Sequence, residues 1–404
     1  MSNPILSDQA LSDIRVIDLS NNVAGAYCTR LFADYGADVI KIEPPLHGDM
    51  SRRIGPFPND VPHTETSGLF IHLNGNKRSV TLDVTSNAGA KLFKELITHT
   101  DLIVETFRPG HLESFGIGYD NLSEINPSLT HASITPFGQT GPYAHYKATD
   151  IGIFAASGRM YPHGDLDREP LPYAPDVVSY QIGSTAAVAS MGSVLASKVQ
   201  SVGDYLDISA METLLGNVDN RLLFYAYTGD KTPRQRWPVG AAQGAYPCLD
   251  GYVVFGVGHN IYFERLCDAM NRKDIYQNPK WDTPQNRGEN AEEFDGMLIE
   301  WLMNHDRREV FEMCQAHRVM CSPIFSIDEL LEDPQLVSRG FFVKTVQPGM
   351  GSLIDTGAPF ILSKTPWRNT RPAPLLGQHN REIFCETLGI SFKELDLLKT
   401  NAVI

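Results

Sequence analysis

The first half of the chain alternates between short apolar runs and segments whose apolar residues recur at helical spacing. Residues 15–19 (RVIDL) predict a strand, and residues 26–35 predict a helix that Gly36 ends, because glycine readily takes the left-handed conformation after a last helical turn. Residues 38–43 (DVIKIE) predict a second strand. A strand, a helix and a strand within roughly 30 residues make a βαβ unit, whose two strands lie parallel in one sheet.

The same alternation continues along the chain. Further strands are expected at residues 79–82, 101–105, 129–135 and 204–209. The helices expected between and after them cover residues 87–99, 119–125, 177–196 and 210–227. Repeated strand–helix units predict a doubly wound α/β domain, with helices on both faces of a parallel sheet.

The pattern changes near Thr228. From there to Pro247 the chain contains Gly, Pro, Arg and Gln with little periodicity, which indicates a linker or an active-site loop. A strand at residues 252–257 and helices at 262–270, 291–304 and 307–317 then predict a smaller α/β domain. From about residue 341 the chain has proline-rich connections and two short predicted helices.

The composition is that of a globular protein with a large core, since 42% of the 404 residues are hydrophobic and 20% are charged. The formal net charge of −14 argues against nucleic acid as the main partner, although local basic residues can still bind an anionic ligand. No apolar run approaches the roughly 20 residues of a membrane helix, so no membrane partner is expected. Residues 1–9 lack the basic and apolar parts of a secretory signal.

The six cysteines are scattered along the chain and form no CxxC pair. Such spacing is typical of reduced thiols and predicts a cytoplasmic protein. It gives no indication of a metal site.

Parallel sheets bind ligands at the carboxyl edge of their strands. The first loop at this edge, residues 20–26, contains the small residues Ala24 and Gly25 but not the GxGxxG pattern of dinucleotide-binding proteins. Close approach of a ligand and tight packing of the helix on the sheet explain these small residues equally well. Glu43 ends the second strand, where an acid either contacts a ribose hydroxyl or faces water.

Two later loops reach the same edge. In the first, Phe107 offers a ring for stacking on a base and Arg108 a guanidinium for phosphates, and the alternative is a Pro-Gly turn with an exposed arginine. The second loop, residues 137–143, is a turn rich in Gly and Pro. It is followed by Lys147, a possible phosphate contact, and by Asp150, a second carboxylate near Asp176.

Asp176 lies between a proline-rich loop and an apolar, helix-like run that is rich in small residues. This position predicts that its carboxylate stands at a helix start, where backbone N–H groups stabilise it as an anion. Taken alone, such an aspartate is an ordinary helix cap, and its significance depends on the residues around it.

Five segments of the chain together resemble one known family. They are AGAYCTRLFADYGADVIKIE, LNGNKRSVTLDV, DLIVETFRPG, SITPFGQTGPYA and APLLGQHN. In this order and spacing they resemble the class III CoA-transferases, the family of formyl-CoA transferase and carnitine CoA-transferase, which also includes α-methylacyl-CoA racemases. The resemblance runs from about residue 15 to residue 389, nearly the whole chain.

The resemblance implies a fold and an assembly. Family members have a Rossmann-like large domain built from both ends of the chain, a smaller α/β domain inserted between them, and an interlocked homodimer of two ring-like chains. The corresponding boundaries here are 1–225 for the N-terminal part of the large domain, 226–335 for the linker and small domain, and 336–404 for the segment that returns to the large domain.

The resemblance also implies a mechanism with acyl-CoA and a carboxylic acid as substrates and no tightly bound cofactor or metal. Asp176 matches the family's nucleophile, which forms an acyl-aspartyl anhydride and then an aspartyl-CoA thioester. Backbone N–H groups near the site would receive the oxyanion of each tetrahedral intermediate. Gly240 and Gly244 lie where the family has a mobile loop, so they are candidate substrate-binding residues together with Asp150. The residues that match the family's CoA contacts are Val23, Ala24, Leu82, Thr106, Phe107, Arg108 and Lys147.

The chain departs from the family at some basic CoA contacts. Pro44, Ser114 and Phe115 stand where relatives have basic residues. The basic residues that are candidates to replace them are Arg52, Arg53, Lys77 and Arg78.

Racemisation of an α-methylacyl-CoA is the alternative activity within the family. This reaction needs an acid and a base on opposite faces of the α-carbon. The racemases have a Gly-His-Asp segment where this chain has Ala148-Thr149-Asp150, and threonine cannot exchange a proton at neutral pH. His145 and His163 are not at the matching place. A CoA-binding protein without transfer activity remains a third hypothesis, against which the presence of Asp176 argues.

The acyl pocket is expected to involve residues 158–173 and 220–237. These ranges contain the aromatic residues Tyr161, Phe224, Tyr225, Tyr227 and Trp237 and the arginines Arg221, Arg234 and Arg236. The arginines either pair with a dicarboxylic substrate or lie on the surface.

Overall fold

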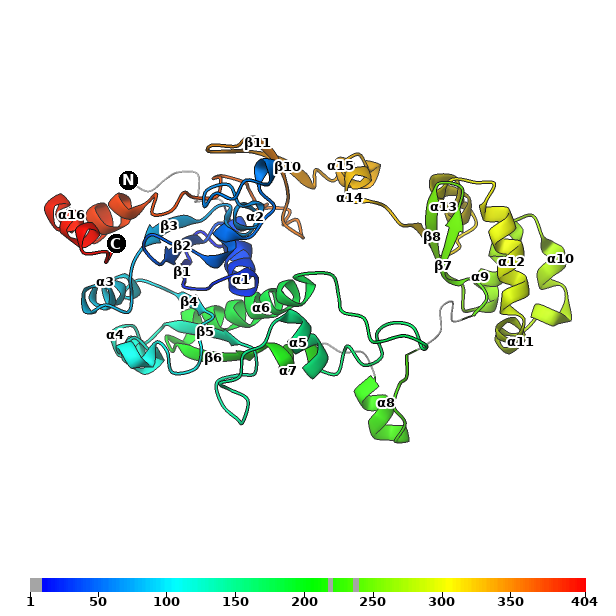
Figure 1. Ribbon diagram of the computed structural model, residues 1–404, viewed down its shortest axis with the longest axis horizontal. Coiled ribbons are helices and arrows are strands. Elements are labelled where there is room, and N and C mark those ends of the chain that lie inside the picture. Colours follow the sequence, from blue (N-terminus) through cyan, green and yellow to red (C-terminus); the bar gives the residue numbers. More distant parts are fainter. Residues whose placement is uncertain (1–8, 217–220, 235–239) are drawn as a thin grey trace. The chain divides into compact units, whose positions relative to one another are not determined.

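The computed structural model describes residues 9–216, 221–234 and 240–404, and it divides into two compact units (Figure 1). The first unit contains Met1–Met160, Pro172–Leu222 and Ser338–Ile404. The second contains Tyr161–Leu171 and Leu223–Val337. The first unit therefore combines segments from both ends of the chain.

A six-stranded sheet in the order β3-β2-β1-β4-β5-β6 forms the centre of the first unit, and every neighbouring pair of strands is parallel. Figure 1 shows the strands in this order. The strands are β1 (Arg15–Asp18), β2 (Asp38–Glu43), β3 (Arg78–Thr81), β4 (Leu102–Glu105), β5 (Thr130–Thr135) and β6 (Asp204–Ser209). This confirms the predicted parallel sheet, and the observed bounds differ from the predicted ones by at most one residue at either end.

Alternate residues of each strand point to opposite faces of the sheet, and each face has its own core. Ile17 of β1 and Ile103 of β4 belong to one core, with the helices α3 (Asn87–Ile97), α4 (Tyr119–Ile125) and α16 (Phe392–Thr400) and the π-helix η5 (Arg381–Thr387). Val16 and Val104 belong to the other, with the helices α1 (Val23–Asp34), α5 (Asp150–Ala156), α6 (Val177–Gln200) and α7 (Ala210–Gly216). Helices therefore cover both faces, as the sequence predicted.

Helix α6 packs closely along α1. A Cβ atom on Gly183 of α6 would lie 2.5 Å from the carbonyl oxygen of Ala24, so only glycine permits this approach. Tyr27 of α1 and Tyr180 of α6 pack edge to face, with ring centroids 4.8 Å apart. These contacts fix the first turns of α6 against the N-terminal half of α1.

The remaining elements of the first unit are shorter. They are α2 (Gly68–Asn74), the 3-10 helices η1 (Met50–Arg53), η2 (Pro58–Asp60) and η3 (Glu113–Phe115), and the antiparallel hairpin β10 (Phe342–Gln347) and β11 (Gly351–Thr356). The hairpin was not predicted, because both strands carry polar residues and are only partly buried. Gly349 in its turn and Gly351 at the start of β11 both have positive φ, and they are the sequence signal that could have identified it.

The second unit has an antiparallel sheet in the order β7-β8-β9 and its own core. Its strands are β7 (Gln243–Cys248), β8 (Gly251–Gly256) and β9 (Cys321–Pro323). Its helices are α9 (Asn260–Ala269), α10 (Lys273–Tyr276), η4 (Pro279–Trp281), α11 (Pro284–Glu289), α12 (Ala291–Leu302), α13 (Arg307–Ala316) and α14 (Ile327–Leu330). The predicted loop up to Pro247 is wrong from Gln243 onwards, because these residues pair with β8.

Two helices stand at the junctions between the units, α8 (Arg221–Thr228) and α15 (Pro334–Ser338). The single helix predicted over residues 210–227 is described as α7 and α8, and residues 217–220 lie outside the described part of the chain. Among the described residues, no helix has the length and apolar character needed to cross a membrane.

Candidate active site

Asp176 is the residue immediately before α6, as the sequence predicted, and its backbone has an unusual conformation. Its φ of 63° and ψ of −7° lie in the left-handed region, which costs a residue other than glycine about 1–3 kcal/mol. Its carbonyl oxygen accepts the first α6 hydrogen bond, from the N–H of Tyr180 at 2.9 Å. Its side chain makes no hydrogen bond to the described N–H groups of the helix.

Asp150, the first residue of α5, takes the capping position instead. One oxygen of its carboxylate accepts from the N–H of Ser179 at 3.1 Å, and the other accepts from the Ser179 hydroxyl at 2.8 Å. Ser179 is the third residue of α6, whose N–H an aspartate at position 176 would ordinarily accept. Asp150 and Asp176 therefore meet at one helix end, and only Asp150 bonds to it.

This arrangement changes the expected charge state of Asp176. Partial burial raises the pKa of the Asp176 carboxyl, and the nearby Asp150 carboxylate raises it further. The expectation that backbone N–H groups stabilise this carboxylate as an anion is therefore wrong. The Asp176 carboxyl is instead more basic than that of an ordinary aspartate, and the residue is half-buried and lacks a capping bond.

The loop after β1 is held by protein groups rather than being open to a phosphate. The N–H of Ser20 donates to Asp18, that of Asn21 to the Thr106 hydroxyl, and that of Asn22 to Asp49. These three N–H groups are therefore already bonded within the protein and are not available to a phosphate. This agrees with the missing GxGxxG pattern, and it leaves Val23 and Ala24, at the start of α1, as the CoA contacts expected from this region.

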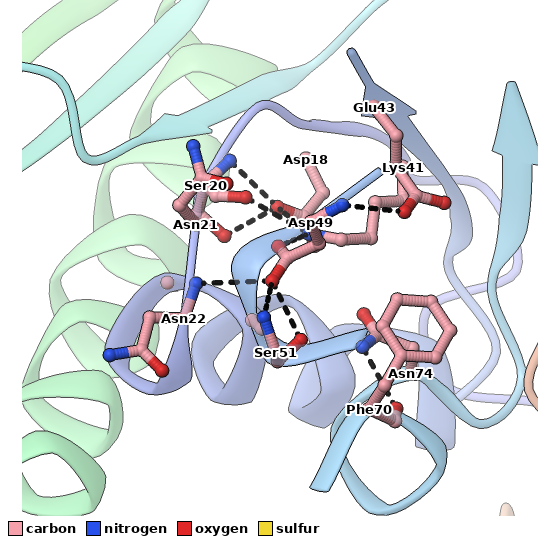
Figure 2. Close-up of polar contacts among 12 residues, drawn as sticks. Asp18, Ser20, Asn21, Asn22, Lys41, Glu43, Asp49, Ser51, Phe70 and Asn74 are labelled. Atoms are coloured by element: carbon pink, nitrogen blue, oxygen red, sulfur yellow. Dashed lines mark hydrogen bonds and ion pairs between the residues drawn. The ribbon is translucent and has the colours of Figure 1, made fainter. Parts of the chain in front are cut away.

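A buried ion network lies beneath this loop (Figure 2). The Lys41 ammonium lies 2.8 Å from Asp49 and 3.5 Å from Asp18, and it donates to the carbonyl oxygen of Ser20 at 3.0 Å. Lys77 lies 2.9 Å from Asp18, and both lysines are fully buried. Two cations lower the pKa of the Asp18 carboxyl despite its burial. The network fixes the loop between β1 and α1.

Gly25 allows that loop to lie against α1. A Cβ atom at this position would be 2.2 Å from the Cβ of Ser20 and 3.1 Å from the Cγ2 of Thr106. The question of why small residues occur here is thus answered for Gly25: it permits close packing of loop on helix.

A cavity of about 240 Å³ opens at the carboxyl ends of the central strands. Leu82 follows β3 and Phe107 follows β4, and both line it, so two of the predicted CoA contacts meet at one site. The other lining residues are Leu19, Asn21, Ile42, Pro44, Asp83, Val84, Thr85 and His111. The ring of Phe107 lies 4.8 Å from that of His111, which the sequence reasoning missed. An apolar cavity with an aromatic wall suits a flat heteroaromatic ring.

Glu105, the last residue of β4, binds the backbone of Phe107 through its side chain. Its carboxylate is 4% exposed and accepts a short hydrogen bond, 2.5 Å, from the N–H of Phe107. Burial raises the pKa of Glu105 to about 7. The nearest ring nitrogen of His131 is 4.0 Å away, and burial lowers the pKa of that imidazole to about 4, so it supplies no positive charge near neutral pH.

Several candidate contacts with the nucleotide are corrected by their actual partners. Glu43 is buried and binds Arg52 through both oxygens, so it neither contacts a ribose nor faces water. Arg52 and Lys77 are fully buried in ion pairs, and Arg78 pairs with Asp38 and Glu382. These three basic residues therefore do not replace the missing phosphate contacts.

Exposed cations remain at the same edge. Arg108 and Lys147 are exposed. Arg53 is also exposed, and it donates to the carbonyl oxygen of His47. These side chains can reach phosphates in water.

The candidate lid residues belong to the second unit. Gly244 lies in β7, Gly240 begins the turn before it, and Ala242 is buried with its N–H bound to Asp295 at 3.0 Å. Of the residues expected to line the acyl pocket, Asn220, Gln235, Arg236 and Trp237 lie outside the described part of the chain.

Comparison with known proteins agrees with this architecture. The model of CoA-transferase family III matches residues 11–380. The succinyl-CoA–D-citramalate CoA-transferase of Chloroflexus aurantiacus is 32% identical over 98% of this chain and 98% of its own. The succinate–glutarate CoA-transferase of Agrobacterium fabrum is 30% identical over 93% and 95%, respectively.

Among solved structures, a CAIB/BAIF family protein from Brucella suis superposes with a TM-score of 0.84 at 26% identity, covering 94% of this chain and 100% of its own. These matches span almost the whole sequence, so the resemblance drawn from the five motifs is confirmed. This chain belongs to CoA-transferase family III, and its enzymatic class is that of the class III CoA-transferases.

Proposed function

We propose that this enzyme transfers CoA from an acyl-CoA to a carboxylic acid through covalent intermediates on Asp176. The observation that carries the proposal is the exposure, hydrogen bonding and raised pKa of the Asp176 carboxyl. It is partly exposed at the start of α6, it makes no capping bond to the described helix, and its pKa is raised. A basic carboxylate with an unoccupied oxygen has the properties required of a nucleophile.

The proposed cycle has four displacements. A carboxylate oxygen of Asp176 attacks the thioester carbon, the C–S bond breaks, and CoA thiolate leaves an acyl-aspartyl anhydride. The thiolate then attacks the aspartyl carbonyl carbon and releases the donor acid as its carboxylate, which gives an aspartyl-CoA thioester. The acceptor carboxylate attacks this thioester and expels CoA thiolate again. The thiolate finally attacks the acyl carbon of the new anhydride and regenerates Asp176. Each step exchanges one nucleophile for one leaving group, so no net proton or electron transfer is required.

We place the adenine of CoA in the cavity lined by Leu82 and Phe107. The apolar walls of the cavity and the ring of Phe107 support this placement. Arg108 and Lys147 are exposed cations suited to the phosphates, and Thr106 and Ala24 are half-buried near the start of α1. Val23 is buried against Leu73, so only its backbone is available to CoA. Coenzyme A acts here as a substrate that enters and leaves.

We propose a dicarboxylic acid as the acceptor. The similar enzymes of known name act with citramalate, oxalate and glutarate, all of which are dicarboxylic acids. A screen of these acids with succinyl-CoA as donor tests this part of the proposal, and monocarboxylic acids such as acetate serve as controls. Faster transfer to acetate than to any of the dicarboxylic acids would refute it.

We further propose a homodimer, interlocked as in the family, in the cytoplasm. Helix α8 supports an assembly because its large apolar residues are exposed by 44–85% of their surface, more than a single chain leaves open on one short helix without a reason. They are Leu222, Leu223, Phe224, Tyr225 and Tyr227. The six cysteines are free thiols, which supports a reducing compartment. Light scattering after gel filtration tests the dimer, and a monomer at micromolar concentration would contradict it.

The nucleophile is tested by mass spectrometry of the enzyme after rapid mixing with succinyl-CoA in the absence of an acceptor. We expect a mass increase on the peptide that contains Asp176. The Asp176→Asn variant should bind CoA with unchanged affinity, form no adduct there and lose roughly three orders of magnitude or more in kcat, because an amide is a poor nucleophile. Transfer by this variant near the wild-type rate refutes the proposal. Loss of α-deuterium from a 2-methylacyl-CoA without an acceptor would instead indicate racemisation.

A further inference from the structure

We propose that Asp150 is a positioning residue of the transfer reaction. It caps α6 in place of Asp176 and thereby leaves the Asp176 carboxylate available to attack the thioester. This inference rests on the proposed role of Asp176 as nucleophile. It adds a function for a second carboxylate, which sequence reasoning had considered only as a substrate contact.

The first argument is the exchange of capping partners. The side chain of an aspartate immediately before a helix usually accepts the N–H of the second or third helical residue. In α6 the N–H of the third residue, Ser179, is bound by Asp150 at 3.1 Å, and the Ser179 hydroxyl is bound by the other oxygen of Asp150 at 2.8 Å. Both oxygens of Asp150 are occupied, and the usual partner of Asp176 is already taken.

The second argument is the backbone of Asp176. A non-glycine residue with a φ of 63° persists only where the surrounding structure holds it. On the C-terminal side, α6 is held by α1 and, through Ser179, by Asp150 on α5. The two hydrogen bonds that Asp150 accepts from Ser179 thus stabilise the first turn of α6, whose position sets the direction of the Asp176 side chain.

The third argument is electrostatic. The titratable groups around Asp176 are Asp150 of α5 and Tyr180 of α6. Around Tyr180 lie Tyr27 and Arg30 of α1, His72 of α2 and Asp355 of β11. The negative charge of Asp150 adds to burial in raising the pKa of Asp176. A more basic carboxylate is a stronger nucleophile towards a thioester carbon, so Asp150 would favour the first displacement in two ways, by geometry and by charge.

Two substitutions separate these contributions. Asp150→Asn keeps an oxygen that can accept one of the two Ser179 hydrogen bonds but removes the charge. Ser179→Ala keeps the charge and the backbone bond but removes the hydroxyl bond. Both variants are first compared with the wild type by circular dichroism, thermal unfolding and CoA binding, so that a folding defect is recognised.

The readout is the rate of adduct formation on Asp176, measured by rapid quench and mass spectrometry from pH 4 to pH 8. For Asp150→Asn we expect a rate that is roughly 10- to 100-fold lower at neutral pH, as for other small displacements of reacting groups. The acid limb of its pH profile should also move to lower pH, because the pKa of Asp176 falls when the neighbouring charge is lost. For Ser179→Ala we expect a smaller loss and an acid limb at the wild-type position.

The outcomes distinguish this inference from the proposed function. If the wild-type enzyme transfers CoA without any adduct on Asp176, the proposed nucleophile is wrong. If the adduct forms in the wild type, and Asp150→Asn forms it at the same rate with the acid limb unmoved, only the role of Asp150 is wrong. A loss of rate by the same factor at every pH, with an unmoved acid limb, also overturns the inference, because it indicates a purely structural role.

Discussion

The hydroxyl of Thr106 accepts a hydrogen bond from the N–H of Asn21 at 2.9 Å, although the two residues are 85 positions apart. Thr106 follows β4 and Asn21 follows β1, so this bond joins two loops at the carboxyl edge of neighbouring strands. It holds the segment that carries Phe107 beside the start of α1. The Thr106 hydroxyl therefore contributes to the spacing between the proposed adenine cavity and the N-terminus of α1.

Replacing Thr106 by valine tests this bond, because valine retains the shape of threonine and removes the acceptor. The loss of one hydrogen bond of about 1 kcal/mol should raise the Michaelis constant for an acyl-CoA roughly fivefold, with a smaller effect on kcat. Steady-state kinetics measure both constants. Thr106→Ser keeps the hydroxyl and is the matched control, and equal Michaelis constants for the two variants would contradict the assigned role.

The close contact at Gly25 predicts a loss of stability on adding one methyl group. In Gly25→Ala the new Cβ atom would overlap Ser20, so the loop must move, and the free energy of unfolding should fall by about 1–3 kcal/mol. Urea unfolding followed by circular dichroism measures the change. Gly192 of α6 is exposed and has no described atoms within 4 Å of its Cβ position. Gly192→Ala should therefore be neutral or stabilising by up to about 1 kcal/mol, and a similar loss in both variants would be inconsistent with the steric argument.

The buried ion network predicts that replacing Lys77 lowers the free energy of unfolding by more than Gly25→Ala does. Its ammonium donates to Asp18, to Asn74, to the Thr29 hydroxyl and to the carbonyl oxygen of Ala26. Lys77→Ala leaves these acceptors buried without their cation, which should lower the free energy of unfolding by about 3–5 kcal/mol. Denaturant unfolding provides the measurement. Lys91→Ala, on the exposed side of α3, should change it by less than about 0.5 kcal/mol, and a loss of that small size for Lys77→Ala would refute the role of the network.

Glu105 predicts a pH-dependent contribution to stability. Burial raises its pKa from the ordinary 4.5 of a glutamate to about 7 in the folded protein, so between these values the folded state binds more protons than the unfolded state. Stability from this group is therefore complete below about pH 4.5 and is lost as pH rises through about 7. The total is on the order of 3 kcal/mol, since each pKa unit corresponds to about 1.4 kcal/mol.

Glu105→Gln removes this proton equilibrium and keeps an oxygen for the N–H of Phe107. We expect the unfolding free energy of the variant, relative to the wild type, to rise by up to about 3 kcal/mol between pH 5 and pH 8. Taking the difference cancels the other titrating groups. Glu95→Gln, an exposed position on α3, is the control, and parallel curves for Glu105→Gln and the wild type would show that the group is ionised throughout.

Much of the sheet domain could be predicted from the sequence because the strands β1 to β5 are mostly buried on both faces and alternate regularly with amphipathic helices. The prediction failed where exposure weakens this signal. Helix α5 has seven residues, and the strands of the hairpin β10–β11 are only partly buried, so neither shows a strong apolar pattern. For α2, the Ser67 side chain that accepts from the N–H of Phe70 was an available but unused capping signal.

The position of Asp176 at a helix start was predictable, whereas its bonding was not. The choice of Asp150 as the cap of α6 depends on how α5 packs against α6, which no local pattern encodes. The same holds for the Lys41 and Lys77 ion pairs, whose partners lie on other elements. A charged residue inside an apolar strand, such as Lys41 in DVIKIE, signals a buried pair, but one sequence does not reveal its partner.

The C-terminal segment of the chain completes the core on one face of the sheet. Phe384, Leu395 and Val403 pack in the same cluster as Ile17 of the first strand, and the carbonyl oxygen of Val403 accepts from the N–H of Asp83 at 2.8 Å. On the ribosome, a nascent chain that ends before these residues leaves that apolar face open to water. The N-terminal strands must therefore wait for the C-terminal segment to emerge, during which time chaperones have an exposed surface to bind.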